Sequence, residues 1–354
     1  MLLSRLSGVG FVALCVAIGV TAPADGRQPS KSAESSLGNY RILKTYEVGG
    51  EGAWDYLTID AEGRRLFVTR STRVMVLDAD TGQSLGEIAD TPGVHGVALV
   101  PELGRGFTSN GKAGSATIFD FKTLKVIGSV KTGENPDAII YEPTTKRIFT
   151  MNGRSKDATA IDAATGEPVG RIELGGKPEF AVADGKGKLF VNLEDTSEVV
   201  VLDPKELKVT ARWPLAPGEE PSGLAIDVKN RRLFSVCGNK MMVVLDADSG
   251  KVVATPAIGE NVDATAFDPT TDLAFSSNGD GTLTIVHEES PSTFTVVQNV
   301  VTLRGARTMA LDPKTHNVFL AAAKFGPTPP PTEENPRPRP SIIPGSFQII
   351  VVGK

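Results

Sequence analysis

Short apolar runs separated by polar turn segments fill the chain from about residue 40 onward. Residues 135–153 (NPDAIIYEPTTKRIFTMNG) show the pattern, which is an apolar run, a Pro-Thr turn and an Ile-Phe pair followed by small polar residues. Six further segments repeat it, and one phenylalanine in each copy marks a period of 40 to 44 residues: Phe67, Phe107, Phe149, Phe190, Phe234, Phe275 and Phe319. A period of this length indicates a repeat architecture.

Each repeat contains four short runs rich in Val, Ile, Leu and Phe, which predict four β-strands. In the fifth repeat the runs are SGLAIDV, RRLFSVC, MMVVLDA and KVVATPAI, and turn sequences such as DTG at 80–82 and ATG at 164–166 separate strands elsewhere. Leucine-rich repeats are shorter than this period, and helical repeats would need apolar positions at helical spacing. The sequence therefore predicts an all-β fold, a seven-bladed β-propeller with four-stranded blades.

The last repeat lacks an outermost strand, because the chain ends at FQIIVVGK soon after the third one. We expect residues 40–48 (YRILKTYEV) to supply that strand and to close the ring of blades. Residues 39–354 then form a single propeller domain. A proline-rich insertion at 325–346 falls between the second and third strands of the last blade, where we expect either a lid over the channel mouth or a disordered surface loop.

The N-terminal segment has the features of a cleaved signal peptide. Residues 1–24 carry Arg5, an apolar stretch at 9–20 and a small-residue sequence, Ala-Pro-Ala. That stretch is short for a bilayer span, so we expect no membrane span after cleavage. Residues 25–38 are polar and are predicted to be a flexible leader. The mature protein is expected to be periplasmic or secreted, and its one remaining cysteine, Cys237, excludes an internal disulfide.

The chain is mildly acidic, with a net charge of −5 at pH 7. Removal of the signal peptide takes away Arg5 and makes the protein more negative. Because a nucleic-acid groove requires a basic face, the charge disfavours nucleic acid as a partner. We expect a monomer that binds a small polar molecule or an envelope protein.

Three tetrapeptides stand out at the ends of predicted second strands. FTSN at 107–110, FTMN at 149–152 and FSSN at 275–278 are each followed by Gly and by an apolar run ending in Asp. In these features residues 40–354 resemble the YVTN-repeat β-propeller family, the YncE-like group of secreted bacterial proteins. The resemblance implies a seven-bladed propeller but no particular chemistry. The other repeats have FVTR, FVNL, FSVC and FLAA, and so lack the turn role expected of the asparagine.

The innermost strands of a propeller begin at one mouth of its central channel. We aligned the inner strands on the residue at which each one ends. Five positions before that residue stand seven side chains, six of which can ionise: Asp55, His95, Asp137, Glu179, Ser222, Asp263 and Arg307. We call these seven residues the ring, and we expect them to surround the channel mouth and to bind a ligand. Trp54, next to Asp55, is expected to be either an aromatic wall of that site or a packing residue.

The ring contains four carboxylates, which repel one another. Two carboxylates about 4 to 6 Å apart repel by roughly 3 to 4 kcal/mol at an effective dielectric near 20. Protonation, pairing with Arg307 or His95, or a bound cation would relieve the repulsion, and a wide, wet channel would screen it. Carboxylate oxygens suit Ca²⁺, Mg²⁺ or Mn²⁺, and one imidazole suits Mn²⁺, Fe²⁺ or Zn²⁺. The predicted ligands of one divalent cation are Asp55, His95, Asp137, Glu179 and Asp263.

The other histidines and the remaining cysteine predict no catalytic or binding role. His287 and His316 are expected to be exposed on the opposite face, with residues 287–289 in a solvated turn, and Cys237 is expected to be a packing residue. The sequence contains no recognisable Ser-His-Asp spacing, phosphate-binding glycine loop, paired-cysteine zinc motif or haem attachment motif.

These observations favour a ligand-binding module. The first alternative is a divalent-metal-dependent hydrolase or lyase, for which His95 is the candidate catalytic acid or base. The second alternative is an envelope scaffold protein that uses the blade edges and leaves the ring idle.

Overall fold

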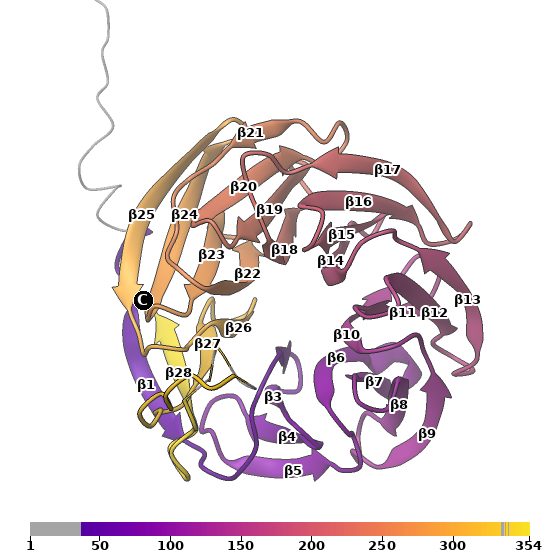
Figure 1. The fold of residues 1–354 in the computed structure, drawn as a ribbon, viewed down its shortest axis with the longest axis horizontal. Helices are drawn as coiled ribbons and strands as arrows, with labels where there is room; N and C mark the ends of the chain where they lie inside the picture. The colour runs from indigo at the N-terminus through magenta and orange to yellow at the C-terminus, as the bar shows by residue number, and fades with distance from the viewer. Residues whose placement is uncertain (1–36, 334–335, 337, 339) are drawn as a thin grey trace, which may run out of the picture.

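Seven four-stranded antiparallel sheets are arranged in a ring around a central axis (Figure 1). The computed structural model describes residues 37–333, 336, 338 and 340–354. The predicted all-β fold is confirmed as a seven-bladed propeller, and the signal peptide at 1–24 and most of the leader at 25–38 lie outside the described residues. In the described part of the chain, no helix has the length and apolar character needed to span a membrane.

In blades 1 to 6 the strands follow one another from the innermost to the outermost position. Those of blades 1 to 3 are β2 (Leu57–Asp60), β3 (Arg65–Arg70), β4 (Arg73–Asp78), β5 (Ser84–Ile88); β6 (Val94–Val100), β7 (Arg105–Asn110), β8 (Ser115–Asp120), β9 (Val126–Lys131); and β10 (Pro136–Glu142), β11 (Arg147–Asn152), β12 (Asp157–Asp162), β13 (Pro168–Glu173). Those of blades 4 to 6 are β14 (Pro178–Ala183), β15 (Leu189–Leu193), β16 (Glu198–Asp203), β17 (Lys208–Pro214); β18 (Pro221–Asp227), β19 (Arg232–Cys237), β20 (Met241–Asp246), β21 (Val252–Ala254); and β22 (Val262–Asp268), β23 (Leu273–Asn278), β24 (Thr282–Ser290), β25 (Thr293–Val301). A single 3-10 turn, η1 (Pro101–Leu103), links β6 to β7.

Blade 7 is built from both ends of the chain. Its inner strands are β26 (Thr308–Leu311), β27 (Val318–Ala322) and β28 (Gln348–Gly353), and its outermost strand is β1 (Arg41–Glu47). β1 and β28 are antiparallel, with Arg41 opposite Gly353 and Glu47 opposite Gln348. The predicted closure of the ring by the N-terminal strand is therefore confirmed.

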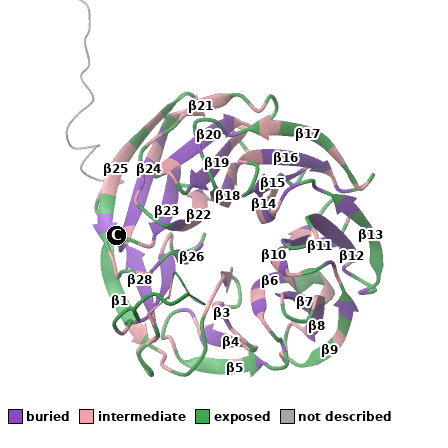
Figure 2. Ribbon diagram, viewed as in Figure 1, coloured by how far each residue is buried: buried purple, intermediate pink, exposed green. Residues whose placement is uncertain are grey.

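The core consists of contacts between neighbouring blades, and the second and third strands carry most of the buried residues (Figure 2). The seven phenylalanines that mark the sequence period are at most 1% exposed. Phe67 of blade 1, for example, lies with its ring centroid 6.1 Å from that of Phe119 in blade 2. Each blade buries its apolar face only against its neighbours, which is why the repeat requires a closed ring.

The asparagines of the three tetrapeptides close the turn after the second strand, as expected, because their backbone carbonyls accept from the amides of Ala113, Lys156 and Gly281. Their side chains also connect strands. Asn152 is fully buried; its Oδ1 accepts a hydrogen bond from Thr150 at 3.0 Å, and its Nδ2 donates to Thr159 on β12 at 2.9 Å. Asn110 and Asn278 form equivalent bonds to Thr117 and Thr284. The oxygen of the buried amide thus accepts a hydrogen bond and its nitrogen donates one, and the donated bond joins the second strand to the third.

The proline-rich insertion lies between β27 and β28, as predicted, and its two ends are fastened together. Phe325 forms a β-bridge with Ile342, and the amide of Ile343 donates to the carbonyl of Lys324 at 2.8 Å. Trp54 packs against Phe325 and Phe347, with ring centroids 6.1 and 5.2 Å away. Trp54 thus packs blade 1 against this loop, while the proposed lid stays a prediction because residues 334, 335, 337 and 339 lie outside the described residues.

The face opposite the ring holds the other histidines. His316 is paired with Asp268 through its Nδ1 at 2.8 Å. The solvated turn predicted at 287–289 is wrong, because these residues extend β24 and Glu288 is only 4% exposed. Cys237 is fully buried, and burial raises the pKa of its thiol to about 12, as expected of a packing residue.

Glu288 is a buried acid whose ionisation opposes folding. Asn230 donates to its Oε1 at 3.0 Å, but its Oε2 has no hydrogen-bond partner among the described residues. Burial, assisted by the charge of Asp227, raises the pKa of Glu288 from 4.5 to about 7. The folded state therefore binds the proton more tightly than the unfolded state, and stability falls as the pH rises through this range.

Replacement of Glu288 by glutamine is expected to remove this penalty. Glu288→Gln should change stability little at pH 5, where the acid is protonated, and should stabilise the fold by about 1 to 2 kcal/mol at pH 8.5. Urea unfolding at both pH values measures the effect. The exposed neighbour Glu289 provides the control, and an equal gain in Glu289→Gln would contradict the assignment.

Candidate functional site

The ring residues occupy irregular positions at the start of the inner strands. In blades 2 to 6 the pairing between the first and second strands shifts register at this point, and the shifted segments contain His95, Asp137, Glu179, Ser222 and Asp263. A β-bulge redirects a side chain away from the regular alternation of a strand. Asp55 and Arg307 stand just before β2 and β26, so all seven predicted residues lie at the same end of the inner strands.

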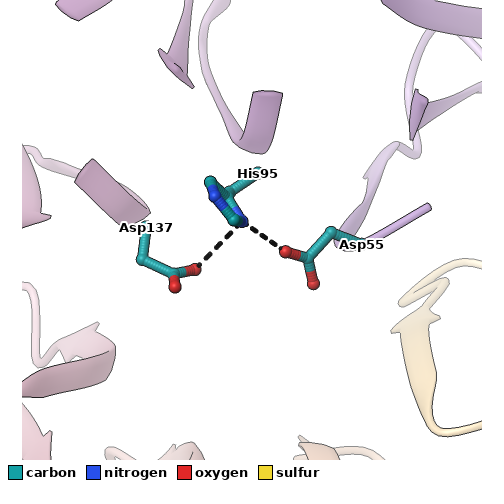
Figure 3. Close-up of side chains that lie close together, drawn as sticks. All are labelled: Asp55, His95 and Asp137. Carbon is teal, nitrogen blue, oxygen red and sulfur yellow. Dashed lines mark hydrogen bonds and ion pairs between the residues drawn. The ribbon is translucent and has the colours of Figure 1, made fainter. Parts of the chain in front are cut away.

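Three ring residues from consecutive blades converge on one point (Figure 3). The Nδ1 atom of His95 lies 2.5 Å from Oδ2 of Asp55 and 3.7 Å from Oδ1 of Asp137. All three side chains are half-buried, with exposed fractions of 15 to 29%. We call Asp55, His95 and Asp137 the trio.

Ser222 and Arg307 form a second group around Asp263. The hydroxyl of Ser222 donates to Oδ1 of Asp263 at 3.2 Å and to its backbone carbonyl at 2.9 Å. The Nε atom of Arg307 lies 3.4 Å from Oδ2 of the same carboxylate. Glu179 stands between the two groups along the ring and is paired instead with Lys177, at 3.3 Å.

Three ring carboxyl groups, those of Asp137, Glu179 and Asp263, have raised pKa values. Burial is the main cause and raises the pKa values of Asp137 and Glu179, with a further contribution from neighbouring carboxylates. Burial also raises the pKa of Asp263 to about 6, against the opposing charge of Arg307. Ionisation of these groups is therefore opposed mainly by burial and, to a lesser degree, by the neighbouring carboxylates, and a nearby positive charge would relieve both effects.

The pKa of His95 is raised as well. Burial alone lowers its pKa, but the hydrogen bond with Asp55 and the charges of Asp137, Asp55 and Glu179 together raise it above the ordinary value. A proton on Nδ1 is therefore held between two carboxylates. The point where the three side chains meet favours a positive charge.

Two residues of the site were missed in the sequence analysis. Lys177, which precedes Glu179 by two positions, also pairs with Glu194. Tyr56, which follows Asp55, forms a hydrogen bond that lowers the pKa of Asp137, while its own pKa is raised well above the ordinary value by burial. Lys177 is the one basic residue at its register position in the seven repeats, and this difference was a usable signal.

The trio has a donor set suited to a divalent cation. One ligand atom from each of the three residues lies within 4.8 Å of the others. The predicted ligands Asp55, His95 and Asp137 are thus brought together, whereas Glu179 and Asp263 lie outside this group. Two carboxylate oxygens and one imidazole nitrogen suit Mn²⁺ or Zn²⁺, and three protein ligands leave coordination positions for a further ligand.

Comparison with known proteins supports the YncE-like resemblance. The chain is 29% identical over 98 residues to "Uncharacterized protein YncE" of Salmonella typhimurium strain LT2 and to the protein of the same name in Salmonella typhi. The matched stretch covers 27% of this chain and 28% of each relative, so the chain spans little more than a quarter of their length. No known protein-family profile matches the chain.

Solved structures similar to this one share its fold. "Kuenenia stuttgartiensis Hydrazine Synthase" has a TM-score of 0.66 at 16% identity, over 75% of this chain and 91% of that chain. "RRP9 WD40 repeats" and "U3-55K" have TM-scores of 0.72 and 0.71 at 9% and 10% identity, over 89% and 88% of this chain and 97% and 98% of theirs. Identities this low show the propeller architecture alone. The chain is a seven-bladed β-propeller whose sequence is YncE-like over part of its length.

Proposed function

We propose that this propeller is a binding module that holds a divalent cation, through Asp55, His95 and Asp137, and with it a small polar ligand at the mouth of its central channel. The observation that carries the proposal is the convergence of His95 Nδ1 with carboxylate oxygens of Asp55 and Asp137 from three consecutive blades. A divalent cation would replace the proton on Nδ1. It would also supply a positive charge near the ring carboxylates.

The residues around the trio support a binding role for the same mouth. Arg307 is half-exposed, and apart from its contact with Asp263 no hydrogen bond of its guanidinium group is found among the described residues. Lys177 pairs with the ring residue Glu179 at 3.3 Å. Both side chains are cations that can attract a polar ligand with oxygen donors toward a bound metal.

The location and assembly are part of the proposal. The signal-peptide pattern of residues 1–24 supports a periplasmic or secreted protein, and closure of the sheet ring supports a monomer. Hydrolase or lyase chemistry and an envelope scaffold stay predictions, since no observation on the described residues tests either.

Metal analysis of the purified protein tests the proposal. Protein prepared without chelator and without a histidine tag is expected to contain one equivalent of a divalent cation. After treatment with chelator it should rebind one equivalent of Mn²⁺ or Zn²⁺ in a calorimetric titration, and more weakly Ca²⁺ or Mg²⁺. Absence of binding for all four cations would contradict the proposed function.

A further inference from the structure

A half-open cavity of about 240 Å³, which we call the chamber, lies inside the propeller against the inner strands of blades 1 to 4. Residues that directly follow ring residues line it: Tyr56 after Asp55, Gly96 after His95, Ala138 after Asp137 and Phe180 after Glu179. The strands that supply the trio therefore also supply the walls of the chamber. Charged groups stand at the start of these strands, and the chamber follows directly along them.

The walls of the chamber are mainly apolar. The rings of Tyr56 and Phe180 lie 5.5 Å apart, and aliphatic residues such as Ile139 and Val182 complete the lining. The Tyr56 hydroxyl is engaged with Asp137, and the Thr58 hydroxyl donates to the carbonyl of Val97 at 2.9 Å. The two hydroxyl groups of the lining are thus already bonded, so an apolar group entering the chamber leaves neither of them without a partner.

The size of the chamber limits what it can hold. Pockets for drug-sized ligands have volumes of about 300 to 1,000 Å³, so this chamber suits a smaller group such as a phenyl ring or a branched alkyl group. Aromatic side chains favour tilted contacts with a further ring. The geometry of the walls therefore favours a compact, flat apolar group.

A ligand whose apolar end fills the chamber has its polar end at the ring, because the ring residues directly precede the chamber residues along the chain. With a divalent cation on the trio, the open coordination positions can accept an oxygen donor. Lys177 and Arg307 favour a donor that carries negative charge. We propose that the chamber receives the compact apolar end of a small carboxylic acid, whose carboxylate binds at the ring on the metal held by the trio. This inference rests on the function proposed above.

Two acids that differ in their apolar ends test the inference. In the Mn²⁺-loaded protein, phenylacetate is expected to bind at least about tenfold more tightly than acetate, because burial of its phenyl group removes apolar surface from water and ordering of the ligand offsets only part of that gain. Calorimetric titration gives both dissociation constants. Equal affinities for the two acids would overturn the inference.

A pair of matched variants locates the preference. Ala138 and Ala264 both follow a ring aspartate and are 5% and 8% exposed, but only Ala138 lines the chamber. Ala138→Leu should fill the chamber and abolish the preference for phenylacetate while acetate still binds, and Ala264→Leu should keep the preference. If Ala138→Leu does not fold, Phe180→Ala removes an aromatic wall and should weaken phenylacetate binding alone. A preference that survives the chamber variant used would overturn the inference.

Failure of the metal proposal gives a different result. If the parent protein binds none of the four cations, both acids are titrated into chelator-treated protein. A preference for phenylacetate that Ala138→Leu abolishes would support the chamber and leave only the metal assignment wrong. No binding of either acid would overturn the chamber as well.

Discussion

Replacement of Asp137 by asparagine is expected to abolish tight divalent-cation binding and to leave the fold intact. Asparagine keeps the shape of the side chain but loses the negative charge that faces His95 Nδ1. Loss of an outer-shell partner already costs about 10- to 100-fold in metal affinity, so loss of a ligating charge should cost on the order of 100-fold or more. Calorimetric titration with Mn²⁺ of the chelator-treated variant measures the loss.

The same variant should not weaken the metal-free protein. Burial raises the pKa of Asp137, so its carboxylate opposes folding once it is ionised, and asparagine removes that cost. The Ser109 hydroxyl donates to the backbone carbonyl of residue 137, which the substitution does not change, and the asparagine Oδ1 can still accept the hydrogen bond from Tyr56. Urea unfolding at pH 7.5 should therefore give a free energy at least equal to that of the parent.

Asp263→Asn is the matched control. Asp263 is a ring carboxylate with a similarly small exposed fraction, 18% against 15% for Asp137, but it pairs with Arg307 and lies outside the trio. Its asparagine variant should bind Mn²⁺ within a few fold of the parent. If Asp263→Asn loses the cation and Asp137→Asn keeps it, the trio is not the metal site.

The fold could be predicted because its signal is repeated seven times. One phenylalanine per repeat is buried between blades, so each copy supports the same period. The closure by β1 also followed from the sequence, since the last repeat is one strand short and an apolar segment precedes the first. Once the period is known, few folds other than a closed circle of similar blades are compatible with it.

The seven ring residues could be predicted because they occupy the same register position in every repeat. Their division into the trio and the group around Asp263 could not. Bulges in the inner strands decide which way each side chain points, and no pattern of apolar and polar residues encodes them. The convergence of Asp55 with His95, and the separate pairing of Asp263 with Arg307, therefore required the structure. The role of Lys177 was missed because a basic residue in a loop before a strand is common.

Residues that replace a motif were the hardest to interpret. In FVTR an arginine replaces the asparagine that ends the tetrapeptide of other blades, which suggests a missing bond. In the structure Arg70 is 1% exposed and provides a different set of bonds. Arg70 connects blade 1 to the segment that follows β1, which is the point where the circle of blades closes.

Replacement of Arg70 by methionine is expected to destabilise the protein by about 3 to 4 kcal/mol, because several backbone carbonyls lose a charged donor in a buried setting. The guanidinium donates to the carbonyls of Gly49, Glu51 and Gly52 at 2.9 to 3.2 Å. It also lies 3.9 Å from the ring centroid of Phe347, which precedes β28. Burial lowers the pKa of Arg70 to about 10, so the charge is retained at neutral pH.

Urea unfolding of three variants separates the hydrogen bonds of Arg70 from its charge. Arg70→Lys keeps the charge but lacks the planar fork that reaches three carbonyls, so its loss should be intermediate. The control is Arg73→Met, because Arg73 pairs with the half-exposed Glu87 at 3.4 Å and shares with Arg70 only the carbonyl of Glu51, at 3.3 Å. An exposed pair of this kind contributes about 1 kcal/mol or less. Suppose that the free energy of unfolding of Arg70→Met lies within about 1 kcal/mol of the parent value, or is no lower than that of Arg73→Met. The closure of the propeller then depends on strand β1 alone. A large loss confined to Arg70 would show that the residue replacing the motif asparagine fastens the first blade to the last.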